Sequence, residues 1–235
     1  MKLLALDSSG LVASVAVTQD DTLVAEFTMN YKKTHSQTLV PMMDAIRQMT
    51  DLDLESIDAI AVAAGPGSFT GLRIGSATAK GLGLALNKPI VPVPTVDGLA
   101  YNLYGTADVV CPIMDARRGQ VYTGLYEFVY TRGKYEMKTL VSQCAVALEE
   151  IAAQINQLGR RVVFLGDGVP VFREKIGEIL TVPYSYAESF QNRQRASAVA
   201  ALGMQYYKAG RYEKAEEHAP EYLRLSQAER ERMEG

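Results

Sequence analysis

The amino-acid sequence predicts an α/β protein built from two tandem modules, the second of them shortened, and three observations carry this prediction. Three strand-like runs open the chain, separated by short hairpin-type connections. Helical and strand-like segments then alternate, which is typical of parallel strands joined by helices. After Pro94 a second set of three strand-like runs begins, so the same order starts again. We expect the first module at residues 1–103 and the second, with a C-terminal helix and a charged tail, at residues 104–235.

The first module is expected to contain five strands and two helices. Apolar runs bounded by turn residues predict the strands, at residues 2–8, 11–18, 22–29, 57–64 and 90–93. A helix is expected from about His35 to Met49 because large apolar side chains line one of its faces. That face carries Leu39, Met42, Met43, Ile46 and Met49. The resulting order, β-β-β-α-β-α-β, matches the actin-like, RNase H-like (ASKHA) module.

The second module repeats this order with fewer residues after its third helix. A helix at residues 95–103 is expected to lead into it. Strands are expected at residues 109–114, 119–128, 135–141, 161–165 and 181–186, and helices at 145–158, 169–180 and 196–209. The tail at residues 210–235 is highly charged, so we expect its end to be a mobile, solvated extension. Tyr222-Leu223-Arg224-Leu225 is the part of it expected to dock.

Composition excludes several classes of protein. The 235 residues carry a net charge of -3, which is not the basic footprint of a stand-alone nucleic-acid binder. No apolar run approaches the roughly 20 residues that a membrane helix requires, and the N-terminus does not resemble a signal peptide. Cys111 and Cys144 lie in separate apolar segments, which is typical of reduced thiols in the cytoplasm. We therefore expect a cytoplasmic protein without membrane partners.

A glycine-rich stretch follows the fourth predicted strand. Gly65-Pro66-Gly67 forms a turn, and Ser68 stands where a helix N-cap belongs. The helix that follows carries Gly71, Gly75, Ala79 and Leu82 on one side, although each interior glycine costs about 0.5–1 kcal/mol against alanine. Two interpretations stay open: tight packing inside the module, or close approach of a ligand or partner chain.

Three places should carry the chemistry if the chain were an ATPase of the actin-like class. Asp7 ends the first strand, but Ser8-Ser9-Gly10 supplies one glycine where a phosphate cradle needs more. Asp115 has the same place in the second module, followed by the bulky Arg117 and Arg118. The adenosine loop is represented only by Gly166 and Gly168, on either side of Asp167. Asp7 and Asp115 are therefore magnesium ligands or hairpin-stabilising residues, and we expect these nucleotide loops to be degenerate.

The sequence predicts neither a metal nor a cofactor. His35 could belong to a metal-binding H-x-x-x-H pair on one helix face, but the partner position is Leu39. His35 is instead expected to bind backbone or a partner, and no Ser/His/Asp or Cys/His set can be assembled. Arg73 and Lys80 on the glycine-rich helix fit a solvated face, or a contact with a partner or phosphate.

Several motifs resemble the bacterial TsaB (YeaZ) family. They are Leu6-Asp7-Ser8-Ser9, Thr34-His35-Ser36-Gln37 through Pro41, the stretch from Gly65 to Leu82, and Met114 to Tyr122. In the second half the resemblance thins to residues 166–168 and 220–224. TsaB proteins are inactive relatives of TsaD, the subunit that installs threonylcarbamoyl on the adenosine beside the anticodon of certain tRNAs. TsaD has the H-x-x-x-H metal pair, so Leu39 is what a paralogue without the metal would show.

The resemblance implies a non-catalytic scaffold subunit. It implies a homodimer alone and a heterodimer with TsaD, in a complex with TsaE that reaches tRNA only through its assembly. The two helices of the first module would form the interface, at His35, Leu39, Met42, Met43, Ile46, Phe69, Leu72, Arg73, Ser76 and Lys80. Ser76 is expected to point outward, so that Ser76→Trp would break the partner complex and spare the fold. Core packing is the competing use of the methionine and glycine faces.

A stand-alone ATP-using transferase or hydrolase of the actin-like superfamily is the alternative function. The Asp7, Asp115 and Gly166-Asp167-Gly168 loops would then form its nucleotide site. Multiple turnover of ATP with magnesium by the purified protein separates the two functions.

Overall fold

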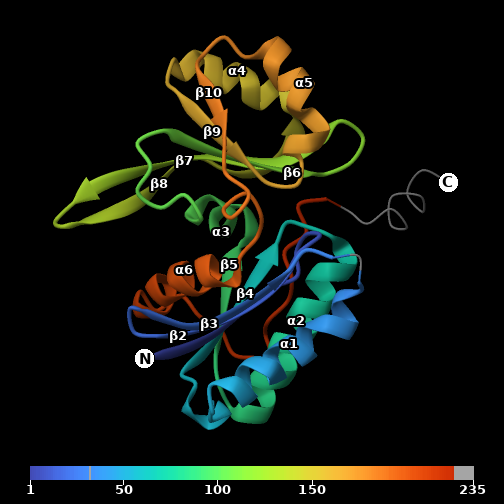
Figure 1. Cartoon of the computed structure of the whole chain (residues 1–235), viewed down its shortest axis with the longest axis vertical. Coiled ribbons are helices and arrows are strands. Elements are labelled where there is room, and N and C mark those ends of the chain that lie inside the picture. Colours follow the sequence, from blue (N-terminus) through green and yellow to red (C-terminus); the bar gives the residue numbers. More distant parts are fainter. Residues whose placement is uncertain (32, 225–235) are drawn as a thin grey trace.

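The computed structural model describes residues 1–31 and 33–224, and it contains two five-stranded sheets stacked one above the other (Figure 1). The first sheet has the order β3-β2-β1-β4-β5. Its strands are β1 (Lys2–Asp7), β2 (Ala13–Gln19), β3 (Thr22–Met29), β4 (Ala59–Gly65) and β5 (Ile90–Pro94). The first three strands pair antiparallel, whereas β1, β4 and β5 run parallel.

The second sheet repeats the first. Its strands are β6 (Val109–Asp115), β7 (Gln120–Thr131), β8 (Lys134–Ala147), β9 (Val162–Leu165) and β10 (Tyr184–Tyr186). Read from β8, the order β8-β7-β6-β9-β10 and the strand directions are those of the first sheet. The predicted fold class, two tandem actin-like modules, is confirmed by this repeated topology, whereas the predicted shortening of the second copy stays a prediction because both sheets have five strands.

The helices cover the sheets as their apolar faces require. In the first module α1 (His35–Met49) and α2 (Phe69–Leu86) pack side by side on one face of the sheet, with a short 3₁₀ turn, η1 (Leu54–Ser56), between α1 and β4. In the second module α4 (Leu148–Leu158) and α5 (Val169–Ile179) cover the outer face. Among the described residues, no helix combines the length and the apolar character of a membrane span.

A shared core lies between the two sheets. It contains α3 (Thr95–Tyr101) and α6 (Ala196–Lys208), with side chains from the facing sides of both sheets (Figure 1). Although α6 comes late in the chain, it packs on β1 and β2 of the first sheet. The boundary between the modules, predicted at residues 103/104, falls between α3 and β6. The division of the chain into two modules at this point stays a prediction.

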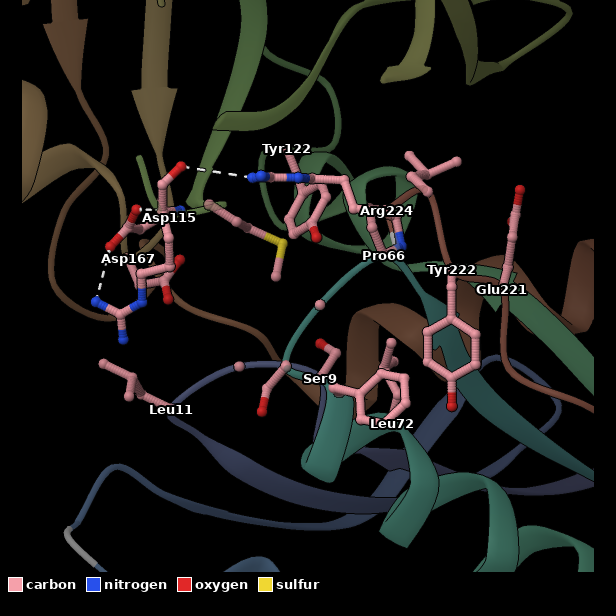
Figure 2. Close-up of a pocket in the computed structure, with 17 residues that line it drawn as sticks. Ser9, Leu11, Pro66, Leu72, Asp115, Tyr122, Asp167, Glu221, Tyr222 and Arg224 are labelled. Atoms are coloured by element: carbon pink, nitrogen blue, oxygen red, sulfur yellow. Dashed lines mark hydrogen bonds and ion pairs between the residues drawn. The ribbon is translucent and has the colours of Figure 1, made fainter. Parts of the chain in front are cut away.

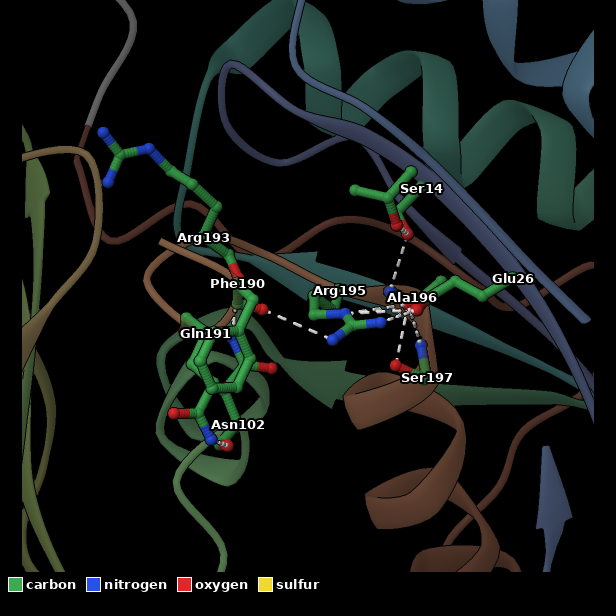
Figure 3. Close-up of polar contacts among 10 residues, drawn as sticks. Ser14, Glu26, Asn102, Phe190, Gln191, Arg193, Arg195, Ala196 and Ser197 are labelled. Atoms are coloured by element: carbon green, nitrogen blue, oxygen red, sulfur yellow. Dashed lines mark hydrogen bonds and ion pairs between the residues drawn. The ribbon is translucent and has the colours of Figure 1, made fainter. Parts of the chain in front are cut away.

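The start of α6 is fixed to the first sheet by polar contacts (Figure 3). The Glu26 carboxylate accepts hydrogen bonds from the Arg195 guanidinium and from the backbone N–H and hydroxyl of Ser197. The Ser14 hydroxyl accepts a bond of 2.9 Å from the Ala196 N–H. A segment that has just left the second module is thereby tied to β2 and β3.

Among the element boundaries that differ from the prediction, the end of β8 differs most. The sequence predicts a helix from Ala145, but β8 continues to Ala147 and α4 begins at Leu148. The reason is pairing, because residues 144–147 form a ladder with residues 120–123 of β7. Long-range hydrogen bonds therefore override the local helical pattern.

The glycine face of α2 packs inside the module. A Cβ added at Gly71 would lie 2.0 Å from the Ser8 carbonyl oxygen, and one at Gly75 would lie 2.5 Å from Ser8 Oγ. Ser68 caps the helix as predicted, because its hydroxyl accepts a bond from the Gly71 N–H. The backbone that approaches α2 is thus the end of β1, which is the first of the two interpretations.

The chain after α6 is held against both modules by hydrogen bonds. Residues 211–224, here called the C-terminal strap, run along α2 and reach the second module. The sequence marked only Tyr222 to Leu225 as able to dock, whereas hydrogen bonds hold residues from Glu213 onward to the first module and Arg224 to the second. Docking at Tyr222, Leu223 and Arg224 is confirmed, whereas Leu225 and the expected mobile end lie outside the described residues.

Candidate functional site

A cavity of about 320 Å³ lies where the two modules meet, at the carboxyl ends of the central strands. The predicted nucleotide loops do come together here, since Ser9, Asp115 and Asp167 all line it (Figure 2). The remaining wall is built by the N-terminus of α2 and by the strap residues Glu221 and Arg224. The sequence marked these three loops, and it missed the strap as a wall of the cavity.

The first loop uses its carboxylate to hold itself. Asp7 Oδ1 accepts hydrogen bonds from the Ser9 N–H at 2.9 Å and from the Ser9 hydroxyl at 2.6 Å. Asp7 is only 2% exposed, and this burial raises the pKa of its carboxyl to about 6, against the smaller lowering effects of the Ser9 bonds and His35. Burying a carboxylate disfavours its charged form, so the geometry fits a hairpin-stabilising residue better than a metal ligand.

The second loop repeats the device in an exposed setting. Asp115 Oδ1 accepts a bond of 2.8 Å from the Arg117 N–H, and Oδ2 pairs with the Arg117 guanidinium at 3.2 Å. Arg117 and Arg118 have φ of 65° and 56°, a left-handed conformation that costs non-glycine residues energy. The backbone therefore bends as a glycine loop would, while two long cationic side chains stand where a phosphate cradle is expected.

The third loop places one acid in the cavity. Gly166 and Gly168 allow the chain to pass against the Ile113 backbone, and Asp167 between them lines the cavity. Burial raises the pKa of Asp167, although the nearby Arg193 acts in the opposite direction. Asp167 Oδ1 has no hydrogen-bond partner among the described residues.

The hydroxyl groups near the cavity serve the fold. Ser8 Oγ donates to the Gly71 carbonyl at 2.8 Å, Ser9 Oγ donates to Asp7, and Ser68 Oγ caps α2. His35 Nε2 binds the Gly10 carbonyl oxygen at 2.8 Å, so the predicted backbone contact of His35 is present. Within residues 1–31 and 33–224, no group of three or more His, Cys, Asp or Glu side chains is arranged to hold a metal ion.

The methionine face of α1 is core. Leu39 is 1% exposed, and Met42, Met43 and Ile46 are buried with it against the first sheet. The prediction that these four side chains form the partner interface is wrong, because a stripe at helical spacing faces the sheet first. The side chains that α1 exposes lie on the opposite side and include Val40, Pro41, Arg47 and Gln48.

The glycine-rich helix divides in the same way. Leu72 and Ser76 are buried, the latter at 6% exposure, so the predicted outward position of Ser76 is wrong. Ser76 lies on the same buried side as Gly75 and Ala79, which pack toward the sheet. The exposed residues of α2 are Thr70, Arg73, Ala77, Gly81, Leu84 and Ala85.

The two cations of α2 contact the strap. The Arg73 Nε–H donates to the Tyr222 hydroxyl at 3.3 Å, and Lys80 Nζ donates to the Glu216 carbonyl oxygen at 2.7 Å. Phe69 is half-buried beneath Arg73 and Tyr222. A segment about 140 residues away in sequence makes these contacts, so the pattern of α2 alone could not predict them.

Fold and cavity together define a two-module protein of the actin-like class whose inter-module loops are held by their own side chains. The family model for TsaD, tRNA N6-adenosine threonylcarbamoyltransferase, matches residues 22–232. Within that class the chain belongs to the TsaB family, because it is 35% identical to the tRNA threonylcarbamoyladenosine biosynthesis protein TsaB of Bacillus subtilis over 97% of this chain and 96% of that protein.

Other relatives agree. The Escherichia coli protein of the same name is 36% identical over 54% of this chain and 55% of its own length. Among solved structures, YeaZ from Pseudomonas aeruginosa has a TM-score of 0.79 at 28% identity, covering 94% of this chain and 99% of that one. The ethanolamine utilization protein EutJ from Carboxydothermus hydrogenoformans, with a TM-score of 0.51 at 12% identity over 86% of this chain and 90% of its own, shares the fold alone.

Proposed function

We propose that this chain is a non-catalytic scaffold subunit in tRNA threonylcarbamoyladenosine biosynthesis. It binds TsaD, together with TsaE, and the assembled complex adds threonylcarbamoyl to the adenosine beside the tRNA anticodon. On this proposal the chain reaches tRNA only through the complex. The relatives named for this pathway support the role, and the chain's own residues support the division of labour.

The observation that carries the proposal is the placement of His35 and Leu39. The resemblance implies that TsaD uses an H-x-x-x-H pair on this helix. Here the second position holds a leucine that is 1% exposed and packs in the sheet core, while His35 binds the Gly10 carbonyl. The helix position that would carry the second imidazole is therefore occupied by a leucine that packs in the core. This supports a subunit that leaves chemistry to its partner.

The exposed sides of α1 and α2 are the proposed partner face. The two helices lie side by side on one face of the sheet, so their outward residues face the same direction (Figure 1). Val40 and Leu84 are each 50% exposed, and Ala77 and Gly81 present little volume between them. Small residues let a partner helix approach closely, and the apolar side chains supply area to bury. On this proposal the exposed positions of α1 and α2 take the place of Leu39, Met42 and Ser76, which are buried.

Titration with TsaD from the same organism tests the proposal. Ala77→Arg places a long cation on the proposed face and is expected to weaken binding at least about a hundredfold, since a close-packed seam has little free volume. Ala201→Arg is the matched control, because Ala201 is exposed on α6 and α6 covers the opposite face of the same sheet. Equal affinity of both variants and the wild type would contradict the proposed face, and absence of wild-type binding would contradict the proposed function.

A stand-alone ATP-using transferase or hydrolase is the second candidate. It is favoured by one observation, the convergence of Ser9, Asp115 and Asp167 on a single cavity. The purified protein incubated with ATP and magnesium decides between the two. Multiple turnover supports the second candidate, whereas turnover that appears only with TsaD supports the scaffold.

A further inference from the structure

The C-terminal strap carries an exposed tyrosine to the edge of the proposed partner face. The Tyr222 ring lies 4.7 Å from the Phe69 ring, measured between centroids, at an angle of 35°. The Arg73 guanidinium carbon lies 3.9 Å from the centroid of the same Phe69 ring. Arg73 also donates to the Tyr222 hydroxyl. We call Phe69, Arg73 and Tyr222 the aromatic corner.

The strap is held on both sides of the aromatic corner. Before it, Glu213 and Ile90 exchange two backbone bonds of 2.9 Å, and Lys80 binds the Glu216 carbonyl oxygen. At the corner, the Glu221 N–H donates to the Ala64 carbonyl oxygen at 2.7 Å. After it, the Arg224 guanidinium donates to the Ala116 carbonyl oxygen in the second module.

The residues of β4 and α2 are shaped to receive the strap. A Cβ added at Gly65 would lie 2.1 Å from the Glu221 carbonyl oxygen, so a larger residue would displace the strap backbone. A Cβ added at Gly83 would lie 2.8 Å from the Ala215 Cβ, so the strap also packs closely on α2. The position of Tyr222 is therefore built into the fold.

The aromatic corner has the composition of a binding hot spot. Tyrosine and arginine are enriched among the residues that dominate binding energy, and a rigid pre-formed group loses little conformational entropy on binding. Tyr222 is 40% exposed, and Arg73 is exposed on the same side of α2 as Ala77. The aromatic corner thus continues the proposed partner face at the N-terminal end of α2.

We propose that the aromatic corner is part of the TsaD-binding surface, and that the strap acts in assembly by presenting Tyr222 there. This inference rests on the proposed function. It assigns a role to a segment that lies far from α1 and α2 in the sequence. A partner seated on α2 and the corner would also lie against the rim of the inter-module cavity, since Phe69 and Tyr222 line both.

Titration of full-length variants with TsaD, each paired with a melting curve, tests the inference. Tyr222→Ala and Arg73→Gln are expected to weaken binding by about tenfold to a hundredfold, while Tyr222→Phe, which keeps the ring stack, stays within about threefold of the wild type. Tyr212→Ala is the matched control. Tyr212 is also on the strap, 51% exposed and stacked on Tyr207 at 4.9 Å, but it lies away from the corner.

The outcomes separate the two proposals. Loss of affinity in Tyr222→Ala and Arg73→Gln, with Tyr212→Ala unchanged and melting temperatures preserved, supports the inference. Wild-type affinity in both corner variants while Ala77→Arg abolishes binding overturns the inference and leaves the proposed function standing. An effect confined to self-association of this chain, with TsaD affinity unchanged, also overturns it. No binding of TsaD by the wild type overturns both.

Discussion

The two modules share one topology but use the loop after their first strand differently. In each, an aspartate at the strand end accepts a hydrogen bond from the N–H two residues later, Asp7 from Ser9 and Asp115 from Arg117. In the first module that loop is buried under the glycine face of α2. In the second it is exposed, and its bend is made by arginines in left-handed conformations.

Both modules share the aspartate turn but differ in the helix that follows their fourth strand. The aspartate turn is a backbone device that both modules need to connect their strands. The helix after the fourth strand differs in length between the modules: α2 has 18 residues, whereas α5 has 11. On the proposed function the outer side of the longer helix faces TsaD, and its glycines let the first loop pack beneath it. The second module retains the sheet, and its loop closes the cavity without forming a phosphate cradle.

The largest expected effect comes from filling the glycine face of α2. Gly71→Ala is expected to lower the free energy of unfolding by about 3 kcal/mol, because the new Cβ meets the Ser8 carbonyl oxygen at 2.0 Å. Gly81→Ala on the exposed side has no atom within 4 Å of the new Cβ and is expected to raise stability by about 0.5–1 kcal/mol. Urea unfolding measures both, and changes of the same sign would contradict the division of the helix.

A smaller effect is expected from the buried Asp7. Its folded-state pKa of about 6 lies above the ordinary 3.8, so the folded protein binds a proton at pH values where the unfolded chain has lost it. Stability contributed by this group is therefore present at low pH and is lost as the pH rises through about 6. Lowering the pH from about 7 to 5 should stabilise the wild type by about 1 kcal/mol more than Asp7→Asn, which cannot titrate. Identical pH profiles in urea unfolding would show that this carboxyl does not titrate there.

The smallest expected effect belongs to the exposed loop of the second module. Arg118→Gly removes the cost of a left-handed non-glycine residue and is expected to stabilise the protein by about 0.5 kcal/mol, part of the gain being offset by unfolded-state entropy. The modification rate of a reconstituted system should not change. A clear loss of stability, or a slower reaction with assembly intact, would assign Arg118 a contact of its own.

Local patterns predicted most of the fold because strand alternation, helix periodicity and turn residues agree along the chain. The repeated strand order followed from them, and the three loops that the sequence marked line one cavity in the structure. The outward sides of α1 and α2 were not predicted correctly, because a periodic apolar stripe shows that a helix has two sides without showing which side meets the sheet. Ser76 and Met42 were therefore predicted to face a partner, but both side chains are buried.

Contacts that depend on distant segments were also out of reach. The sequence marked Tyr222 to Leu225 as able to dock, but not that Arg73 and Lys80 would meet the strap. Asp97 lies in the first turn of α3, where an acid is favoured by the helix dipole. In the structure its carboxylate also accepts bonds from the Tyr126 and Tyr206 hydroxyls, joining α3 to β7 and α6, and burial raises its pKa. Such partners are set by tertiary packing, which a single sequence does not contain.

The central claim is that this chain assembles the enzyme and does no chemistry in its own cavity. Its most direct test is the tRNA-modification rate of a reconstituted complex that contains the triple variant Asp7→Asn, Asp115→Asn, Asp167→Asn. The substitutions keep the hydrogen-bond acceptors of the loops and remove the three loop carboxylates, while Glu221 of the strap stays in the cavity wall. The kcat of the variant complex is expected to lie within about twofold of the wild-type value. A fall of more than about tenfold, equivalent to some 1.4 kcal/mol of transition-state stabilisation, with affinity for TsaD unchanged, would contradict it.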